Sequence, residues 1–511
     1  MFIIIIGVLV LNFFALLWLS FLFVGKGSDH YFYDFYIESI RRNKNKFFSI
    51  FPNFINQTYI TDPQFFFWLL SFFPKGRIKW VGLLLNPFLI TLMGFIVFLF
   101  LRLELHLSYD LILVILCATL VTPQFFYGQN ARIYGLNARG IGMVLMVFYL
   151  ICSYYFVINQ HVVAAYVFAV LTAYLIWGTS LFAQQALVFF SLIGAIFFGW
   201  FDLILVLIVS VLVFYILHTK YARLYFINRW KYLIIYKNVF ADTFILKARY
   251  SIWRDFIYDF WLFKKNGLKK QLLYIYYNAA IAIIFLNPVV LFCIYTSMFN
   301  AQIINTPIAF FCSKIIIAGV IIFILTSFRY TRVLGEPERY LELIIPFVNI
   351  FAIPIIINSY SYSKVIYLII IFLVISIIQI LVFTFFLKDV GNSNVSMIET
   401  VRNLINKSIT NNVKVSFFCN NFNWSSYNLN ADWNFVHYYP TANYLANIPV
   451  ISLIEEYPFV KEEFVHKIQQ HYNVMFILID RRKWNKDLET WNEMQIIIQN
   501  EKFILYKRIE L

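Results

Sequence analysis

The most regular feature of this sequence is a series of long apolar stretches separated by short polar and aromatic connections. None of them shows the period of two that a membrane-spanning strand requires, and most are near the roughly 20 residues that a helix needs to cross a bilayer. Because backbone amides in hydrocarbon need internal partners, these stretches predict helices. They lie at residues 2–24, 80–101, 109–121, 139–157, 162–177, 181–200, 203–218, 272–298, 307–328, 340–357 and 365–387.

This pattern predicts a mainly α, polytopic membrane protein with about eleven transmembrane helices. The first stretch has no basic residue ahead of it and is longer than a signal-peptide core, so we interpret it as a retained span. The stretches at 109–121 and 162–177 are short, and re-entrant or broken helices are the alternative there.

The pattern changes after residue 387, where Asn, Lys, Glu and Trp replace the Phe and Ile of the spans. Strand-length apolar runs follow at 413–419, 450–453, 474–479 and 503–508, and helical patterns follow at 441–447 and 460–472. Residues 388–511 therefore predict a small water-facing α/β domain behind a membrane module at residues 1–387.

Composition and charge narrow the class further. With 61% hydrophobic and only 13% charged residues in 511, the chain has too little polar surface for a soluble protein. The C-terminal domain holds equal numbers of basic and acidic residues, so the net charge of +15 belongs to the membrane module. Many of these positive charges lie in a basic segment at 219–270 with interleaved Tyr and Trp, which predicts interfacial helices that contact anionic membrane lipids. Guidance of a phospholipid substrate is the second interpretation, and no nucleic-acid motif accompanies the charge.

The motifs of several enzyme classes are missing. The five cysteines and seven histidines show no metal-ligand spacing, so we predict no metal site from ligand motifs. Glycine-rich phosphate loops are also absent, and the chemistry must come from the polar residues at the ends of the spans.

The first connection, residues 25–79, holds a carboxylate among aromatic residues. Asp29 is followed by His30 and a run of Tyr and Phe, and the spacing of apolar residues predicts a membrane-surface helix over 29–42. Asp29 near that helix N-terminus would stay ionised and can act as a general base, the alternative being an exposed loop residue. Asp62 precedes a second, short aromatic helix whose first turn would contain Pro63, and a plain N-cap is its alternative role.

Cationic candidates stand ahead of two later spans. Arg132 and Arg139 precede the span at 139–157, where a snorkelling anchor is the alternative interpretation. Arg339 lies in the segment Gly335-Glu336-Pro337-Glu338-Arg339-Tyr340. There Arg339 can pair with Glu336 or Glu338, and part of the segment can serve as a helix cap.

Several short motifs together resemble the GT-C superfamily of membrane glycosyltransferases, in a poorly characterised prokaryotic branch. They are Ser28-Asp29-His30-Tyr31-Phe32 followed by Ile40-Arg41-Arg42-Asn43, the block from Asp62-Pro63-Gln64 to Ser71-Phe72-Phe73-Pro74, Asn137-Ala138-Arg139-Gly140-Ile141-Gly142, and Gly335-Glu336-Pro337-Glu338-Arg339-Tyr340.

This resemblance implies transfer of a hexose or pentose from a polyprenyl-phosphate donor to a lipid, glycan or protein acceptor at the exoplasmic face, with inversion. It places Asp29 as the base and makes Arg132, Arg139 and Arg339 candidates for holding the leaving phosphate. His30, Asp62, Glu336, Glu338 and Tyr340 would support the site. No cofactor is implied with certainty, and the need for a divalent cation stays open.

Two other functions remain open from the sequence. A transporter or flippase for lipid-linked glycans or anionic substrates would also combine many helices with positive loops, and a polysaccharide polymerase or ligase would share the chemistry. Eleven spans from a cytoplasmic start place the first connection, the basic segment and the C-terminal domain outside a bacterial or archaeal cell membrane. The positive-inside rule instead favours a cytoplasmic basic segment.

Overall fold

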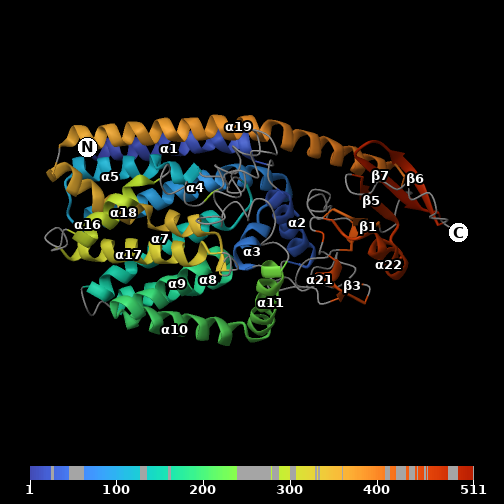
Figure 1. Cartoon of the computed structure of the whole chain (residues 1–511), viewed down its shortest axis with the longest axis horizontal. Coiled ribbons are helices and arrows are strands. Elements are labelled where there is room, and N and C mark those ends of the chain that lie inside the picture. The colour runs from blue at the N-terminus through green and yellow to red at the C-terminus, as the bar shows by residue number, and fades with distance from the viewer. Residues whose placement is uncertain are drawn as a thin grey trace. The chain divides into compact units, whose positions relative to one another are not determined.

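The computed structural model describes most of the chain as a helical bundle and a small mixed sheet (Figure 1). The described residues are 1–24, 28–44, 63–126, 135–158, 163–238, 278, 287–299, 306–328, 331, 334–359, 361–408, 415–421, 433–436, 444–445, 447–453, 456, 459–481 and 493–509.

Every apolar stretch expected to span the membrane contains a helix. These helices are α1 (Phe2–Phe23), α4 (Ile78–Leu99), α5 (Tyr109–Val121), α7 (Arg139–Ile158), α8 (Val163–Thr179), α9 (Leu181–Phe198), α10 (Phe201–Leu217), α16 (Pro288–Phe299), α17 (Pro307–Thr326), α18 (Pro337–Ser359) and α19 (Tyr362–Lys407). Within the described residues, seven are long and apolar enough to cross a membrane, and α5, α8, α10 and α16 are shorter apolar helices. The prediction of a polytopic helical membrane protein is confirmed.

The chain divides into two compact units. The first unit, which we call the bundle unit, comprises Met1–Val24, Trp80–Ala222 and Phe244–Phe385. The second, which we call the polar unit, comprises Gly25–Lys79, Arg223–Thr243 and Phe386–Leu511. It therefore joins the first connection and part of the basic segment to the C-terminal part of the chain.

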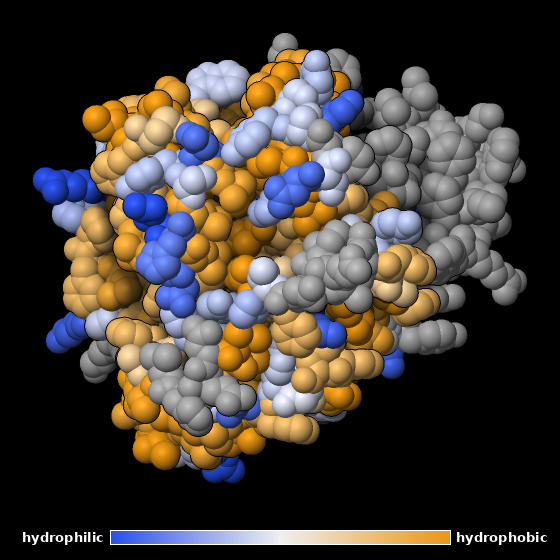
Figure 2. Space-filling model, turned by 90° about the vertical axis from the view of Figure 1, so that its left-hand side faces the viewer, coloured by the Kyte–Doolittle hydropathy of each residue, from blue (hydrophilic) through white to orange (hydrophobic). Residues whose placement is uncertain are grey.

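Helix α18 forms the centre of the bundle unit. Its residues from Pro337 to Ile353 are almost all buried, and α17 packs along it. The outer helices instead expose large apolar side chains, such as Trp18 on α1 and Phe201 on α10. Exposed apolar side chains on outer helices are expected where helices contact lipid. Figure 2 shows apolar residues over much of the side of the molecule that it faces.

The polar unit contains the two helices expected in the first connection. Helix α2 (Ser28–Arg42) matches the prediction, and Tyr36, Ile37 and Ile40 form its buried face. Helix α3 (Phe65–Ser71) begins after Gln64, so the expectation that Pro63 lies in its first turn is wrong. A short 3-10 turn (Lys75–Arg77) follows, and α11 (Thr219–Asn238) covers the start of the basic segment.

The C-terminal part forms a five-stranded mixed sheet with the order β2-β1-β5-β7-β6. Its strands are β1 (Ser416–Cys419), β2 (Asn434–Phe435), β5 (Phe476–Asp480), β6 (Met494–Gln499) and β7 (Phe503–Arg508), with a separate β3 (Tyr444–Leu445) and β4 (Ile448–Pro449) pair. Strands β2, β1 and β5 run parallel, and β7 is antiparallel to β5. This confirms the small α/β domain.

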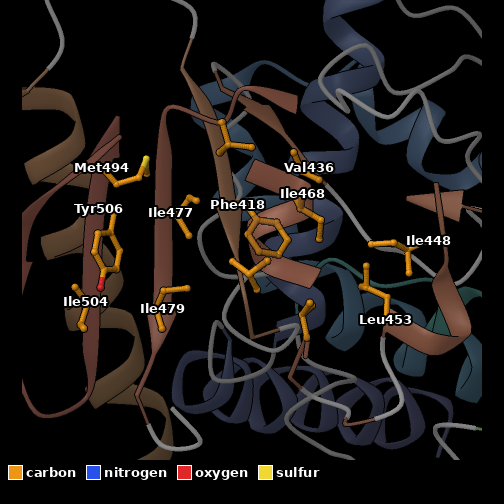
Figure 3. Close-up of a cluster of buried hydrophobic side chains, with 13 residues drawn as sticks. Phe418, Val436, Ile448, Leu453, Ile468, Ile477, Ile479, Met494, Ile504 and Tyr506 are labelled. Atoms are coloured by element: carbon orange, nitrogen blue, oxygen red, sulfur yellow. The ribbon is translucent and has the colours of Figure 1, made fainter. Parts of the chain in front are cut away.

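Alternate residues of this sheet build its apolar core. Phe418, Ile477 and Tyr506 point to one face, where Ile468 of α22 (Glu462–Tyr472) covers them (Figure 3). Burial of this apolar face is the main favourable term that holds α22 on the sheet.

Two local predictions in this domain are wrong. Residues 450–453 form the short helix α21 (Val450–Leu453), and the stretch expected to be helical at 441–447 contains strand β3. Both segments are too short for periodicity to decide between helix and strand. Strand β6, whose sequence is Met-Gln-Ile-Ile-Ile-Gln, was not predicted.

Candidate functional site

The chain segments at one end of the bundle unit converge on a small group of charged side chains. Gln124, just after α5, donates from Nε2 to the carbonyl oxygen of Glu338 at 3.0 Å. Asn287, just before α16, donates from Nδ2 to Gln124 Oε1 at 2.9 Å. The start of α9 reaches the same place, because Gln185 lies beside Gly335.

The strongest electrostatic contact there joins α7 to α18. The Nη2 atom of Arg139 donates to both carboxylate oxygens of Glu342. The side chain of Arg139 is 11% exposed and that of Glu342 is 3% exposed, so water screens this pair little. An ion pair that links two helices in an apolar interior fixes their relative position, because separation would leave two buried charges.

Arg339 lies near this pair and has its own carboxylate. Its Nε atom is 2.5 Å from Oε2 of Glu336, and its guanidinium carbon is 5.8 Å from the centre of the Phe182 ring. The alternative from sequence, that Arg339 pairs with a nearby glutamate, is thus what the structure shows. Its five N–H donors allow Arg339 to keep one carboxylate and still bind a phosphate oxygen.

The motif from Asn137 to Gly142 performs two local tasks. Asn137 Oδ1 accepts from the backbone N–H of Arg139 at 2.8 Å and caps the start of α7. Gly140 and Gly142 let that start approach its neighbours, since a Cβ on Gly142 would lie 2.5 Å from Ser180 Oγ. Gly140 thereby packs closely against Leu89 of α4, and Gly142 against the start of α9.

Tyr340 closes the turn that opens α18. Its hydroxyl donates to the carbonyl oxygen of Leu334 at 2.6 Å, and its ring packs against Phe182 and Phe189. Gly335 has φ +125° in this turn, and a Cβ there would lie 2.5 Å from the Tyr340 hydroxyl. Only glycine adopts this backbone conformation freely.

Glu342 is the main residue of this group that sequence reasoning missed. It lies within a predicted span, one helical turn after Glu338, and a carboxylate inside a span is itself a signal of function or of pairing. Gln124 and Asn287 carried no such signal, because single amides at the ends of spans are common.

One further charged residue, Lys314, lies within the predicted span at 307–328, where a charge is unusual, and the structure places it on α17. Its Nζ atom lies 5.2 Å from the Phe198 ring centre and 5.3 Å from that of Phe310. Cation–π contacts with two rings give the ammonium group a favourable environment without a carboxylate.

The polar unit holds the candidates from the first connection. The backbone of Asp29 lies in the first turn of α2, and its side chain lies outside the part of the chain that the structure describes, as do Asp62 and Arg132. Burial lowers the pKa of His30 from 6.5 to about 4, so its imidazole is neutral at physiological pH.

Helix α2 is tied to α3 by rings and by an arginine. The Tyr33 and Phe67 rings stack with centroids 4.4 Å apart. Arg41 donates from Nε to the Ser71 carbonyl oxygen at 2.9 Å and from Nη2 to that of Phe73, and it pairs with Glu38 at 2.9 Å. Arg41 thereby supplies hydrogen-bond donors to carbonyl oxygens at the C-terminal end of α3, where the helix itself provides none.

The carboxyl group of Asp34 on α2 has a raised pKa. Burial, and then the charge of Glu38, raise the pKa of Asp34, against the opposing effects of Arg41, Lys75 and Arg402. Asp34 is therefore more easily protonated than an exposed aspartate.

Comparisons with known proteins give structural neighbours. The sequence matches no protein-family model and no curated protein. The structure is similar to ArnT from Cupriavidus metallidurans bound to undecaprenyl phosphate, with 10% identity, a TM-score of 0.44 and coverage of 99% of this chain and 98% of that chain. For ArnT in the apo state the values are 10%, 0.43, 99% and 97%.

A third neighbour is the Archaeoglobus fulgidus oligosaccharyltransferase in complex with Zn and sulfate. Its identity is 13% and its TM-score 0.44, over 89% of this chain and 64% of that chain. All three TM-scores lie below 0.5 and all three identities at or below 13%. No residue role in this chain is taken from them.

We predict that the Arg139–Glu342 pair is strongly coupled. Replacing either residue alone by Met leaves a buried charge and costs about 3–5 kcal/mol, whereas the double variant R139M/E342M costs less than the sum. Unfolding of the purified proteins in the same detergent measures this. Glu336→Gln is the matched control and has a smaller effect, because Arg339 is 21% exposed. Additive single effects would contradict the coupling.

We predict that Gly335→Ala destabilises the protein by more than about 1 kcal/mol, because φ and the Tyr340 hydroxyl both oppose a Cβ. In a Tyr340→Phe background the added cost is smaller, since the contact with the hydroxyl is removed. Thermal unfolding of the four proteins separates the two terms. Gly7→Ala, where a Cβ meets nothing within 4 Å, is the control. Equal costs in both backgrounds would show that the hydroxyl contact contributes nothing.

We predict that His30 makes folding sensitive to acid. Its pKa is about 4 in the folded state against 6.5, so the unfolded state binds the extra proton first. The contribution of neutral His30 to the free energy of unfolding is therefore fully present above pH 6.5. It falls as the pH decreases from 6.5 to 4 and does not change further below pH 4. The difference in unfolding midpoint between parent and His30→Gln across this range isolates the effect from Asp34. The same slope in both proteins, with exposed His471→Gln as control, would refute it.

Proposed function

We propose that this protein is a membrane glycosyltransferase that moves a hexose or pentose from a polyprenyl-phosphate donor to an acceptor at the exoplasmic face, with inversion. The observation that carries the proposal is the group of charged residues at the N-terminal end of α18: Arg139, Arg339, Glu336, Glu338 and Glu342. Placing so many charges inside an apolar bundle is expensive, and such groups mark sites that handle polar substrates.

The proposed chemistry needs cations at a leaving phosphate. As the bond from the sugar C1 to the phosphate oxygen breaks, negative charge grows on the phosphate, and guanidinium groups stabilise this transition state more than the bound donor. Arg339 suits this role best because its side chain is more exposed than that of Arg139, the other candidate arginine that the structure describes. Arg139, which is paired with Glu342, would contribute less than Arg339 to holding the phosphate. Arg132 is retained as a candidate from sequence alone.

The reaction also needs a base at the acceptor. The acceptor hydroxyl attacks C1 from the face opposite the phosphate and loses its proton, and we assign this proton to the Asp29 carboxylate. His30, Asp62, Glu338 and Tyr340 are proposed as supporting residues. His30 is neutral because burial lowers its pKa, so it can only donate or accept hydrogen bonds there without adding charge.

We predict that Asp29→Asn slows sugar transfer by about 10²- to 10⁴-fold with little change in the KM for the donor, as expected for loss of a general base. The assay follows labelled sugar from undecaprenyl-phosphate donors to acceptors in membranes that contain the protein. Asp110→Asn, an exposed carboxylate in the first turn of α5, is the matched control and keeps the parental rate.

Arg339→Gln in the same assay raises the KM for the donor, while Arg339→Lys keeps part of the binding. Transfer by Asp29→Asn at the parental rate would refute the assignment of the base. Movement of the labelled donor across the membrane without any transfer would instead favour a flippase.

A further inference from the structure

The C-terminal sheet has a feature that glycosyl transfer in the membrane does not explain. Strand β1 lies between β2 and β5, and all three run parallel. The chain passes from β1 to β2 on one side and later to β5 on the other. In open sheets of this kind, ligands bind outside the carboxyl ends of the strands where the connections diverge.

Polar side chains meet at the carboxyl ends of β1 and β5. Asn420 and Asn421 follow β1 directly, and Asp480 is the last residue of β5. Asn421 donates from Nδ2 to the Asp480 carboxylate at 2.6 Å, and the Asp480 backbone N–H donates to Asn420 Oδ1 at 2.7 Å. All three residues are 0% exposed.

One donor in this group has no partner. Asn420 Nδ2 is buried and makes no hydrogen bond to any residue that the structure describes. Its own Oδ1 is held by the Asp480 backbone, so the amide N–H groups lie beside the Asp480 turn. Leaving a buried donor unpaired costs about 1–3 kcal/mol, and buried donors in folded proteins almost always have partners. A ligand acceptor atom would remove this cost.

The donor and the carboxylate together select the class of ligand. A bare cation is disfavoured by the amide N–H groups, and an anion is disfavoured by Asp480. A neutral hydroxyl satisfies both, because its oxygen accepts from Asn420 Nδ2 while its hydrogen is donated to the Asp480 carboxylate. Asn421 contributes by holding the Asp480 carboxylate in place through its own amide donor.

We propose that Asn420, Asn421 and Asp480 form a saccharide-binding site at the carboxyl edge of the C-terminal sheet (Figure 3 shows the core of this sheet). The proposal goes beyond the function proposed above, because binding here requires neither transfer nor a lipid donor.

Access to the site involves the segment before α22. The backbone of Phe459 pairs with Asn421, and the Val460 N–H donates to the Asn420 carbonyl oxygen at 2.9 Å. Because the three site residues are 0% exposed, a saccharide reaches them only when a neighbouring segment moves, and we assign this movement to Phe459 and Val460. Binding therefore changes amide hydrogen exchange at these two residues.

The test uses the full-length protein in nanodiscs and titrates it with glucose, galactose, mannose, N-acetylglucosamine, arabinose and their disaccharides, with glycerol as the polyol control. We expect saturable binding of at least one saccharide, and at least tenfold weaker binding by Asp480→Asn and by Asn420→Leu. Exposed Glu501→Gln keeps the parental affinity. Hydrogen exchange at Phe459 and Val460 changes with the saccharide in the parent and in Glu501→Gln only.

Asn420→Leu removes the Nδ2 donor but also the Oδ1 acceptor of the Asp480 N–H, so its unfolding midpoint is expected to fall. Asp480→Asn guards against this folding artefact, because its amide oxygen can still accept from Asn421, so its unfolding midpoint is expected to be kept while saccharide binding is weakened. Three results overturn the proposal: no saccharide of the panel binds the parent, both variants bind as the parent does, or glycerol binds as tightly as the sugars. The assay contains no lipid donor, so failure of the proposed transfer does not affect its outcome.

Discussion

The buried pairing of Arg139 with Glu342 sets the arrangement of the charged end of the bundle. Neither charge is tolerable alone in an apolar interior, so α7 and α18 must meet where the guanidinium group faces the carboxylate. The local motifs around the pair serve this approach. Asn137 starts α7 at Arg139, and the glycines at 140 and 142 bring the helix close to its neighbours.

The turn before α18 has a geometric requirement of its own. Gly335 adopts a left-handed conformation so that the Tyr340 ring can fold back and its hydroxyl can reach Leu334. The chain thereby presents Glu336, Glu338 and Arg339 together at the beginning of a helix that is otherwise apolar. Of Arg339 and Arg139, Arg339 has the more exposed side chain, whereas Arg139 is paired with Glu342 across two helices.

The polar unit is held together by other kinds of contact. Its helices α2 and α3 are joined by stacked rings and by Arg41, which satisfies the last carbonyl groups of α3. Its sheet is held by an apolar face under α22, while polar side chains gather at the carboxyl edge of β1 and β5.

The sequence alone determined the class of protein, the helices of the bundle, α2 and three strands of the C-terminal sheet, β1, β5 and β7. Long apolar runs have one stable solution in lipid, and the segments were long enough for periodicity to identify them. It also marked Arg139, Arg339, Glu336, Glu338 and Tyr340 as candidates, because clustered polar residues at the end of a span are conspicuous. Short elements such as α21 and β3 were wrong, since a few residues fit either period.

Only the tertiary structure decided which of these residues meet. Glu342 was hidden within a span, and its pairing with Arg139, 203 positions away in the chain, depends on how α7 crosses α18. The contact of Asn420 and Asn421 with Asp480 likewise depends on β1 and β5 being neighbours in the sheet. Such contacts join distant segments, and the pairing is fixed by packing of whole elements, which no local pattern of residues records.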